Sequence, residues 1–156
     1  MIHIVDHYDF ASKHIEHWRK LVPDYLKSNG DKVSVFNGAS TSLGGVSVVG
    51  DIHYKASQFS KMYDGILRGN FSNGDIVIFA NAWNINVLNF RLIAQYLGLD
   101  LKFIGVWMDG VFDPNSKLWY NMYGTDKKWI KLLEKSLYRS YNMNFFITPT
   151  QKNRFH

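Results

Sequence analysis

The feature that most constrains this fold is an alternation of short apolar runs with helical patterns. Six runs rich in β-branched or aromatic residues indicate strands, at 2–5, 33–36, 46–49, 76–80, 101–107 and 144–147. Apolar spacings of three and four indicate helices at 12–26, 84–98 and from 126 onward, with a weaker pattern at 56–67. Helices between strands indicate a mostly parallel sheet, because parallel neighbours need a long return connection. We therefore predict an α/β fold, a Rossmann-like three-layer sandwich of about six strands.

Particular residues mark the ends of the expected helices. Pro23 should break or restart the first helix, because proline fits only the first turn. Asn84 is a good N-cap, and Gly98 suits a left-handed C-terminal cap. The segment 84–98 is therefore the helix whose ends the sequence marks most clearly.

Composition limits the class of protein. With 156 residues, 46% of them hydrophobic, the chain can bury one good core, so we predict one domain, 1–156. The absence of cysteine excludes disulfides, thiolate metal sites and cysteine nucleophiles, and it suits a reducing compartment. The sequence does not open like a secretory leader, and its apolar runs are too short to cross a bilayer. We expect a soluble, cytoplasmic protein with no membrane partner.

The net charge of +5 is concentrated in the last third of the chain. Up to Gly110 there are ten Lys/Arg and ten Asp/Glu, whereas from Val111 onward there are eight and three. The basic residues of the last predicted helix are Lys127, Lys128, Lys131, Lys135 and Arg139. They are either a solvated helix face or a surface that meets a phosphate-rich partner such as DNA.

Ligands of open parallel sheets bind beyond the carboxyl ends of the strands, near the point where strand order reverses. The residues that follow each predicted strand are therefore the informative ones. His7 and Asp9 follow the first strand, and Asn81 and Trp83 follow the run at 76–80. Together with Trp107, at the end of the run at 101–107, they are our candidate substrate-binding residues.

Several common motifs are missing from the sequence. It contains neither a phosphate-binding G-x-x-x-x-G-K-[ST] loop nor a G-x-G-x-x-G dinucleotide fingerprint. The glycines between residues 38 and 50 indicate a turn or a flexible loop, with close approach to a phosphate as the alternative. No D-x-D pair follows a strand, so we predict no metal site and no metal-held sugar nucleotide.

The segment FIGVWMDGVFDPNSKLWYN, residues 103–121, contains the most informative carboxylate. A buried strand ends at Trp107, and Asp109 follows before a glycine. A carboxylate beside aromatic rings is costly unless it is paired or used, which suits a general base that takes a proton from a hydroxyl. The alternative is that Asp109 only caps a turn.

The sequence resembles the N-terminal domain of glycosyltransferases that have two Rossmann domains, the GT-B architecture. In particular it resembles the phage DNA glucosyltransferases. The resemblance rests on DIVIFANAW (75–83), on residues 103–121 and on FFITPTQKNRF (145–155). It implies metal-independent transfer of a sugar from a nucleotide-sugar donor to an acceptor hydroxyl, for example on modified phage DNA, without a cofactor. It also implies that Asp109 is the base and that Asn81 and Trp83 line the same cleft.

The sequence departs from that family in two respects: it lacks the donor-binding domain, and its first loop lacks the usual glycines. Either the chain is part of a longer protein, or a second domain or chain supplies the donor half, or the chain is not a catalyst. Two other functions stay open. One is a non-catalytic module that binds nucleic acid or a partner through the basic helix 126–141, and the other is a one-domain nucleoside hydrolase or transferase using Asp9 or Asp109.

Overall fold

The computed structural model describes residues 1–7, 17–39, 48–108, 110, 112 and 128–155. Within these residues the chain forms an α/β fold with one parallel five-stranded sheet. The strands are β1 (Ile2–Val5), β2 (Val33–Phe36), β3 (Ile76–Phe79), β4 (Lys102–Trp107) and β5 (Met143–Phe146). Their order across the sheet is β2-β1-β3-β4-β5, and every neighbouring pair is parallel. The predicted parallel α/β sheet is confirmed.

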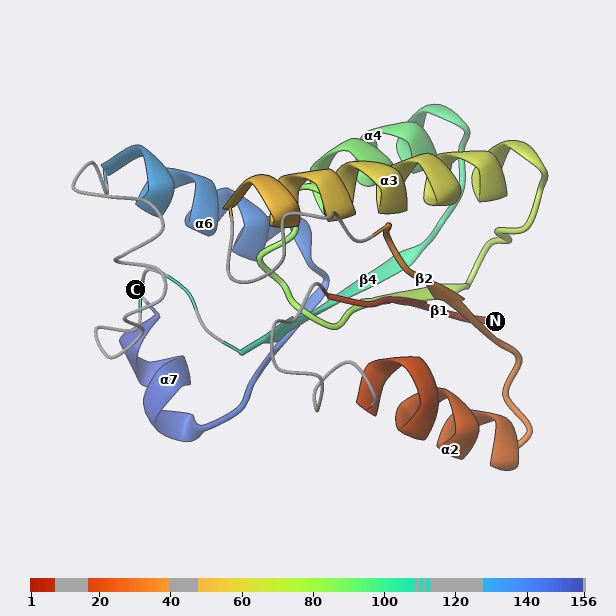
Figure 1. Ribbon diagram of the computed structural model, residues 1–156, viewed down its shortest axis with the longest axis horizontal. Coiled ribbons are helices and arrows are strands. Elements are labelled where there is room, and N and C mark those ends of the chain that lie inside the picture. The colour runs from red at the N-terminus through yellow and green to blue at the C-terminus, as the bar shows by residue number, and fades with distance from the viewer. Residues whose placement is uncertain (8–16, 40–47, 109, 111, 113–127, 156) are drawn as a thin grey trace.

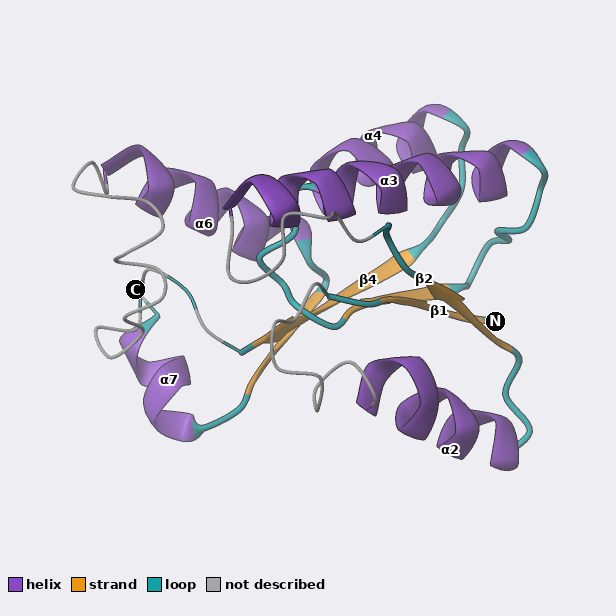
Figure 2. Ribbon diagram, in the orientation of Figure 1, coloured by secondary structure: helices purple, strands orange, loops and turns teal. Residues whose placement is uncertain are grey.

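Helices lie on both faces of the sheet. The helices α3 (Val48–Leu67), α4 (Asn86–Tyr96) and α6 (Lys128–Ser140) lie together on one face, whereas α2 (Val22–Ser28) lies on the other (Figures 1 and 2). A turn of π-helix, η1 (His17–Leu21), leads into α2, and α7 (Pro149–Arg154) follows β5. None of the helices in the described ranges is both long and apolar enough to cross a membrane.

One predicted strand is wrong. The run at 46–49 was expected to be a strand, but Val48 and Val49 begin α3, which continues to Leu67. The segment VSVV has three valines in four residues, and a short run of this kind fits either a strand or part of a buried helix. The long helical pattern that follows it decides the outcome. The described residues therefore contain five strands rather than about six.

The helix-end predictions hold in most details. Pro23 lies in the first turn of α2, which begins at Val22 after η1. Gly98 follows α4 with φ +69, the left-handed conformation that glycine adopts without strain. The Oδ1 atom of Asn84 accepts a hydrogen bond from the Asn86 amide at 3.0 Å, although the residue preceding α4 is Ile85.

The core lies between the sheet and the layer formed by α3, α4 and α6. Alternate residues of the central strands point into it, including Val77, Phe79, Phe103 and Trp107. Gly105 lets the Tyr141 ring pack closely against β4, because a Cβ there would lie 2.7 Å from that ring, closer than packed atoms approach. This side of the sheet is therefore fixed by large, close-packed side chains.

A buried polar cluster ties the amino ends of three strands together. His3 Nε2 lies 2.8 Å from Asp75 Oδ2, and His3 Nδ1 lies 2.7 Å from Ser34 Oγ. Asp75 also accepts hydrogen bonds from the Met1 amino group and the Ser72 amide. The carboxylate can only accept, so Nε2 carries a proton, and in the neutral ring Nδ1 accepts from the serine. Burial lowers the pKa of His3, which favours this neutral form.

Lowering the pH from about 7.5 to about 5.5 should reduce the free energy of unfolding through His3. Burial lowers the pKa of His3 below 6.5 despite its hydrogen bond to Asp75. The unfolded chain therefore binds a proton near pH 6.5 that the folded chain does not bind, so this stability is present above about pH 6.5 and is lost below it. Burial raises the pKa of Asp75, but its hydrogen bonds lower it by more, so the net pKa is lowered. The contribution of Asp75 to stability is therefore lost only at more acidic pH.

Urea unfolding at both pH values measures this effect. His3→Gln should have a flatter dependence of unfolding free energy on pH than the unchanged chain, whereas His53→Gln, on the exposed side of α3, should keep the original dependence. An equally steep dependence in His3→Gln would show that other groups account for it.

Candidate functional site

The order of the strands places a topological switch point between β1 and β3. From β1 the chain moves outward to β2, and it then returns across β1 to β3 and continues to β4 and β5. Open parallel sheets bind ligands beyond the carboxyl ends of the strands at such a point. Asp6 and His7 follow β1 there, and Asn81 and Trp83 follow β3. This carboxyl edge is the candidate site.

Asp6 is anchored by three side chains from two other elements. Its carboxylate accepts hydrogen bonds from Arg19 in η1, from the Tyr54 hydroxyl at 2.6 Å and from Gln58 Nε2 at 3.0 Å. Burial and the bond to Asp6 raise the pKa of Tyr54 to about 12, so its hydroxyl stays protonated and donates. Asp6 is 1% exposed, and its oxygens are occupied, so it holds β1 to α3 rather than acting on a substrate.

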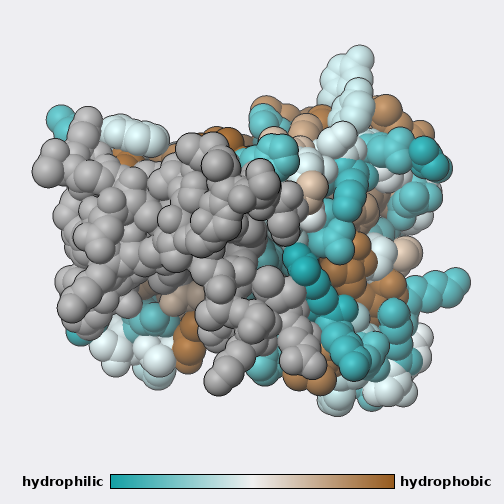
Figure 3. Space-filling model, in the orientation of Figure 1, coloured by the Kyte–Doolittle hydropathy of each residue, from teal (hydrophilic) through white to brown (hydrophobic). Residues whose placement is uncertain are grey.

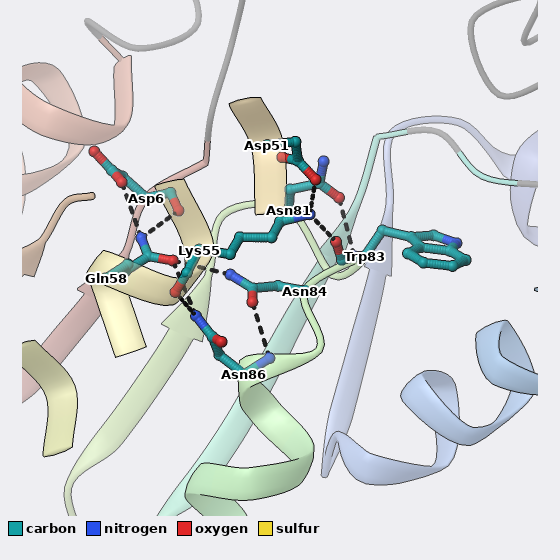
Figure 4. A network of polar contacts seen from close by, with 8 residues as sticks. All are labelled: Asp6, Asp51, Lys55, Gln58, Asn81, Trp83, Asn84 and Asn86. Atoms are coloured by element: carbon teal, nitrogen blue, oxygen red, sulfur yellow. Dashed lines mark hydrogen bonds and ion pairs between the residues drawn. The ribbon is translucent and has the colours of Figure 1, made fainter. Parts of the chain in front are cut away.

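Gln58 joins the ends of β1, β2 and β3. Its amide nitrogen donates to the carbonyl oxygens of Asp6 and Phe36 at 2.8 and 2.9 Å, and its oxygen accepts from Asn84 Nδ2 at 3.1 Å. The side chain is 0% exposed. These bonds satisfy backbone groups at the strand ends and fix the loop between β3 and α4 (Figure 4).

Lys55, one turn before Gln58 in α3, holds the same loop from its other side. Its ammonium group donates to Asp51 Oδ2 at 2.7 Å and to the Trp83 carbonyl at 2.8 Å. The amide of Asn86, at the start of α4, donates to the Lys55 carbonyl at 2.8 Å. Figure 4 shows these side chains converging on residues 81–86, whose backbone is therefore preorganised.

Glu134 is a buried carboxylate between the ends of β3 and β4. Its Oε2 accepts from the Trp83 indole N–H at 2.6 Å, and its Oε1 accepts from the Phe112 amide at 3.0 Å. A Cβ on Gly110 would lie 2.5 Å from the same carboxylate, so glycine allows this close approach. Glu134 therefore fixes the backbone at residues 110 and 112 relative to Trp83.

The predicted base, Asp109, lies outside the described residues. The residues before and after it are held in place by hydrogen bonds and close packing. Trp107, at the end of β4, is 0% exposed, and its indole N–H donates to Asn144 Oδ1 at 2.7 Å. The carbonyl of Met108 accepts from Gln151 Nε2 at 3.2 Å. The ring of Trp107 thus packs within the core and supports the strand end instead of facing solvent.

The remaining predicted residues are distributed as follows. His7 is buried directly after β1, and Asn81 is partly exposed and accepts from the Trp83 amide at 3.0 Å. Asp9 and Lys127 lie outside the described residues. The other predicted basic residues, Lys128, Lys131, Lys135 and Arg139, are exposed on α6. The structure therefore brings His7, Asn81 and Trp83 to the carboxyl edge and leaves the four cations on the outer side of the helix layer.

A cleft of about 460 Å³ adjoins the site where α3, α4 and α6 begin. Most of its walls are apolar, and they include Ile52, Phe59, Ile85 and Trp129. Three of its polar side chains, those of Asp51, Lys55 and Asn86, are occupied by the bonds described above. A polar substrate would find few hydrogen-bond partners in this cleft, so we do not propose it as the substrate-binding site.

Sequence reasoning missed Gln58, Tyr54 and Glu134. Glu134 could have been found, because it shares the buried side of its helix with Ile130 and Leu137, and an acid in an apolar line needs a partner. Gln58 carries no comparable signal, because its role depends on carbonyl groups that only the folded sheet brings together.

Comparison with models of protein families gives no match for this sequence, and comparison with curated proteins gives none either.

Proposed function

We propose that the chain is the acceptor-side half of a glycosyltransferase, a Rossmann-like sandwich that holds a hydroxyl acceptor at the carboxyl edge of its sheet. The observation that carries the proposal is the switch point between β1 and β3. The next strand in the sheet is β4, and in the sequence its carboxyl end leads to Asp109. The preorganised loop at 81–86 supplies one partly exposed polar side chain, Asn81, beside that edge. Helices on both faces of a parallel sheet are compatible with such a half.

In the proposed reaction, Asp109 takes the proton of the acceptor hydroxyl as its oxygen attacks the anomeric carbon of the donor sugar. The bond between that carbon and the diphosphate breaks, and the nucleoside diphosphate leaves with the electron pair. A donor-binding domain, on the same or another chain, presents the sugar. A hydroxymethylated base in DNA is the acceptor we would test first.

Two measurements on the chain test this proposal. Calorimetry should detect saturable binding of a hydroxymethylated oligonucleotide or nucleoside, and a labelled-sugar assay with several nucleotide sugars should detect slow transfer to it. Acceptor binding is the primary readout, because the donor side belongs to the other domain. Failure of every acceptor to bind at millimolar concentration, together with the absence of transfer, would remove the proposal.

A further inference from the structure

Arg19, in the π-helical turn η1, is held at the carboxyl edge of the sheet by a buried acid. Its Nε–H donates to Asp6 Oδ2, and its Nη2 donates to the Tyr54 hydroxyl. The guanidinium carbon lies 5.9 Å from the centre of the Tyr54 ring. Asp6 directly follows β1, one of the two strands at the switch point. The guanidinium is therefore fixed where open parallel sheets bind their ligands.

The side chains that anchor Arg19 are themselves buried and bonded to one another. Asp6 and Tyr54 are each 1% exposed, and the Tyr54 hydroxyl donates to Asp6 Oδ1 at 2.6 Å. The Asp6 carboxylate also accepts from Gln58 Nε2 at 3.0 Å, so Arg19 is only one of its three side-chain donors. Burial alone would lower the pKa of Arg19, but the bonds to Asp6 and Tyr54 raise it, so the guanidinium stays charged.

These two bonds leave one edge of the guanidinium available. The group has five N–H donors in one plane, and Asp6 and Tyr54 bind the edge formed by Nε and Nη2. The edge formed by Nη1 and Nη2 keeps three N–H groups that have no hydrogen-bond partner among the described residues. The side chain of Arg19 is 34% exposed. It can therefore bind a second oxyanion through two parallel hydrogen bonds while it keeps its anchors.

The surroundings of Arg19 favour an anionic ligand. Within the described residues, Asp6 is the only acid at ion-pair distance from Arg19. The surface over α2, into which η1 leads, is largely hydrophilic in the space-filling view (Figure 3). A phosphate monoester carries nearly two negative charges and three acceptor oxygens, whereas a carboxylate carries one charge and two oxygens. A planar fork of N–H donors should therefore bind phosphate more strongly than carboxylate.

We propose that Arg19 is a phosphate-binding residue, whose Nη1 and Nη2 bind two oxygens of a phosphate group on a ligand held at the end of β1. The phosphate can belong to a small molecule, as a monoester, or to a nucleic-acid strand, as a diester. Asp6 and Tyr54 order the long side chain before the ligand arrives, which reduces the entropy lost on binding. The residue lies at the edge proposed for the acceptor, but the inference does not depend on sugar transfer.

NMR spectroscopy of the arginine side chain tests the proposal on the unchanged protein. Inorganic phosphate, thymidine 5′-monophosphate and an oligothymidine of eight nucleotides should each shift the ¹H–¹⁵N signal of the Arg19 Nε–H in a saturable manner. Thymidine, and sodium acetate at equal ionic strength, should shift it little. Tighter binding of the oligonucleotide would identify a nucleic-acid strand as the source of the phosphate, and tighter binding of the mononucleotide would identify a small molecule.

Matched variants assign the effect to the fork of Arg19. Arg19→Gln should weaken binding of thymidine 5′-monophosphate by at least about tenfold. Arg68→Gln is the control, because Arg68 is an exposed arginine whose partner, Asp64, is also on the surface of α3, and its replacement should leave the affinity unchanged. Arg19→Lys keeps a positive charge beside Asp6, which protects the fold, but it lacks the planar fork and should weaken binding by at least about fivefold. Urea unfolding curves check that each variant folds.

Three results would overturn the proposal. They are equal shifts of the Arg19 signal with acetate and with phosphate, no shift with any of the three phosphate probes, and equal affinity of Arg19→Lys and the unchanged chain for thymidine 5′-monophosphate. Failure of a hydroxymethylated nucleoside to bind would instead count against the proposed acceptor site, so the two proposals can fail separately.

Discussion

Replacing Asp109 with Asn should lower the rate of sugar transfer by at least about 100-fold, because general-base catalysis contributes about 10² to 10⁴ to such reactions. The amide is nearly isosteric with the carboxylate but cannot take the proton of the acceptor hydroxyl. Binding of the acceptor should change little, since the proton moves only in the transition state. The labelled-sugar assay gives the rate, and calorimetry gives the dissociation constant of the acceptor.

Asp100→Asn is the matched control for this change. Asp100 precedes β4 at the opposite edge of the sheet, where its exposed side chain pairs with Lys102. Its replacement should leave both the rate and the affinity unchanged. If Asp109→Asn transfers sugar as fast as Asp100→Asn, then Asp109 is not the base.

Replacing Gln58 with Leu should lower the free energy of unfolding by about 3 kcal/mol. Leucine fills much of the same space but leaves the Asp6 carbonyl oxygen and the Asn84 side-chain amide without their buried partner, whereas the Phe36 carbonyl keeps its bond from the Asp6 amide. Each unsatisfied buried group costs about 1–3 kcal/mol, and partial relaxation reduces the sum. Urea unfolding followed by circular dichroism measures the change.

Gln95→Leu controls for the change of residue type, because Gln95 is exposed on α4. Its effect should stay within about 0.5 kcal/mol, the usual range for surface substitutions. Gln58→Leu should also weaken acceptor binding, since the loop at 81–86 would lose its anchor. Equal stability of the two variants would mean that the Gln58 bonds do not hold the strand ends together.

Much of the fold could be predicted because local patterns and global topology agree. Apolar runs at 2–5 and 33–36 became β1 and β2 with the predicted bounds, and Gly98 took its left-handed conformation after α4. The prediction at 46–49 failed because valines favour a strand locally, whereas the helical pattern that follows them makes Val48 and Val49 the start of α3.

From the sequence, only the expected location of the candidate site could be given, and not the contacts of its residues. Residues at strand ends could be chosen, since parallel strands bring their carboxyl ends to one edge. The sequence could not show that Trp107 packs in the core, because an aromatic residue at a strand end can face either side. Nor could it predict the bonds of Gln58, which join the ends of β1 and β2 to the loop that follows β3.

The most direct test of the account is to map acceptor binding by ¹H–¹⁵N NMR spectroscopy of the assigned backbone amides. The account predicts that a hydroxymethylated nucleoside shifts the amides of Asn81, Trp83 and Met108, at the carboxyl edge, and leaves Gly74 and Lys102, at the amino edge, unmoved. Shifts confined to Gly74 and Lys102, or an unchanged spectrum at saturating acceptor, would contradict it.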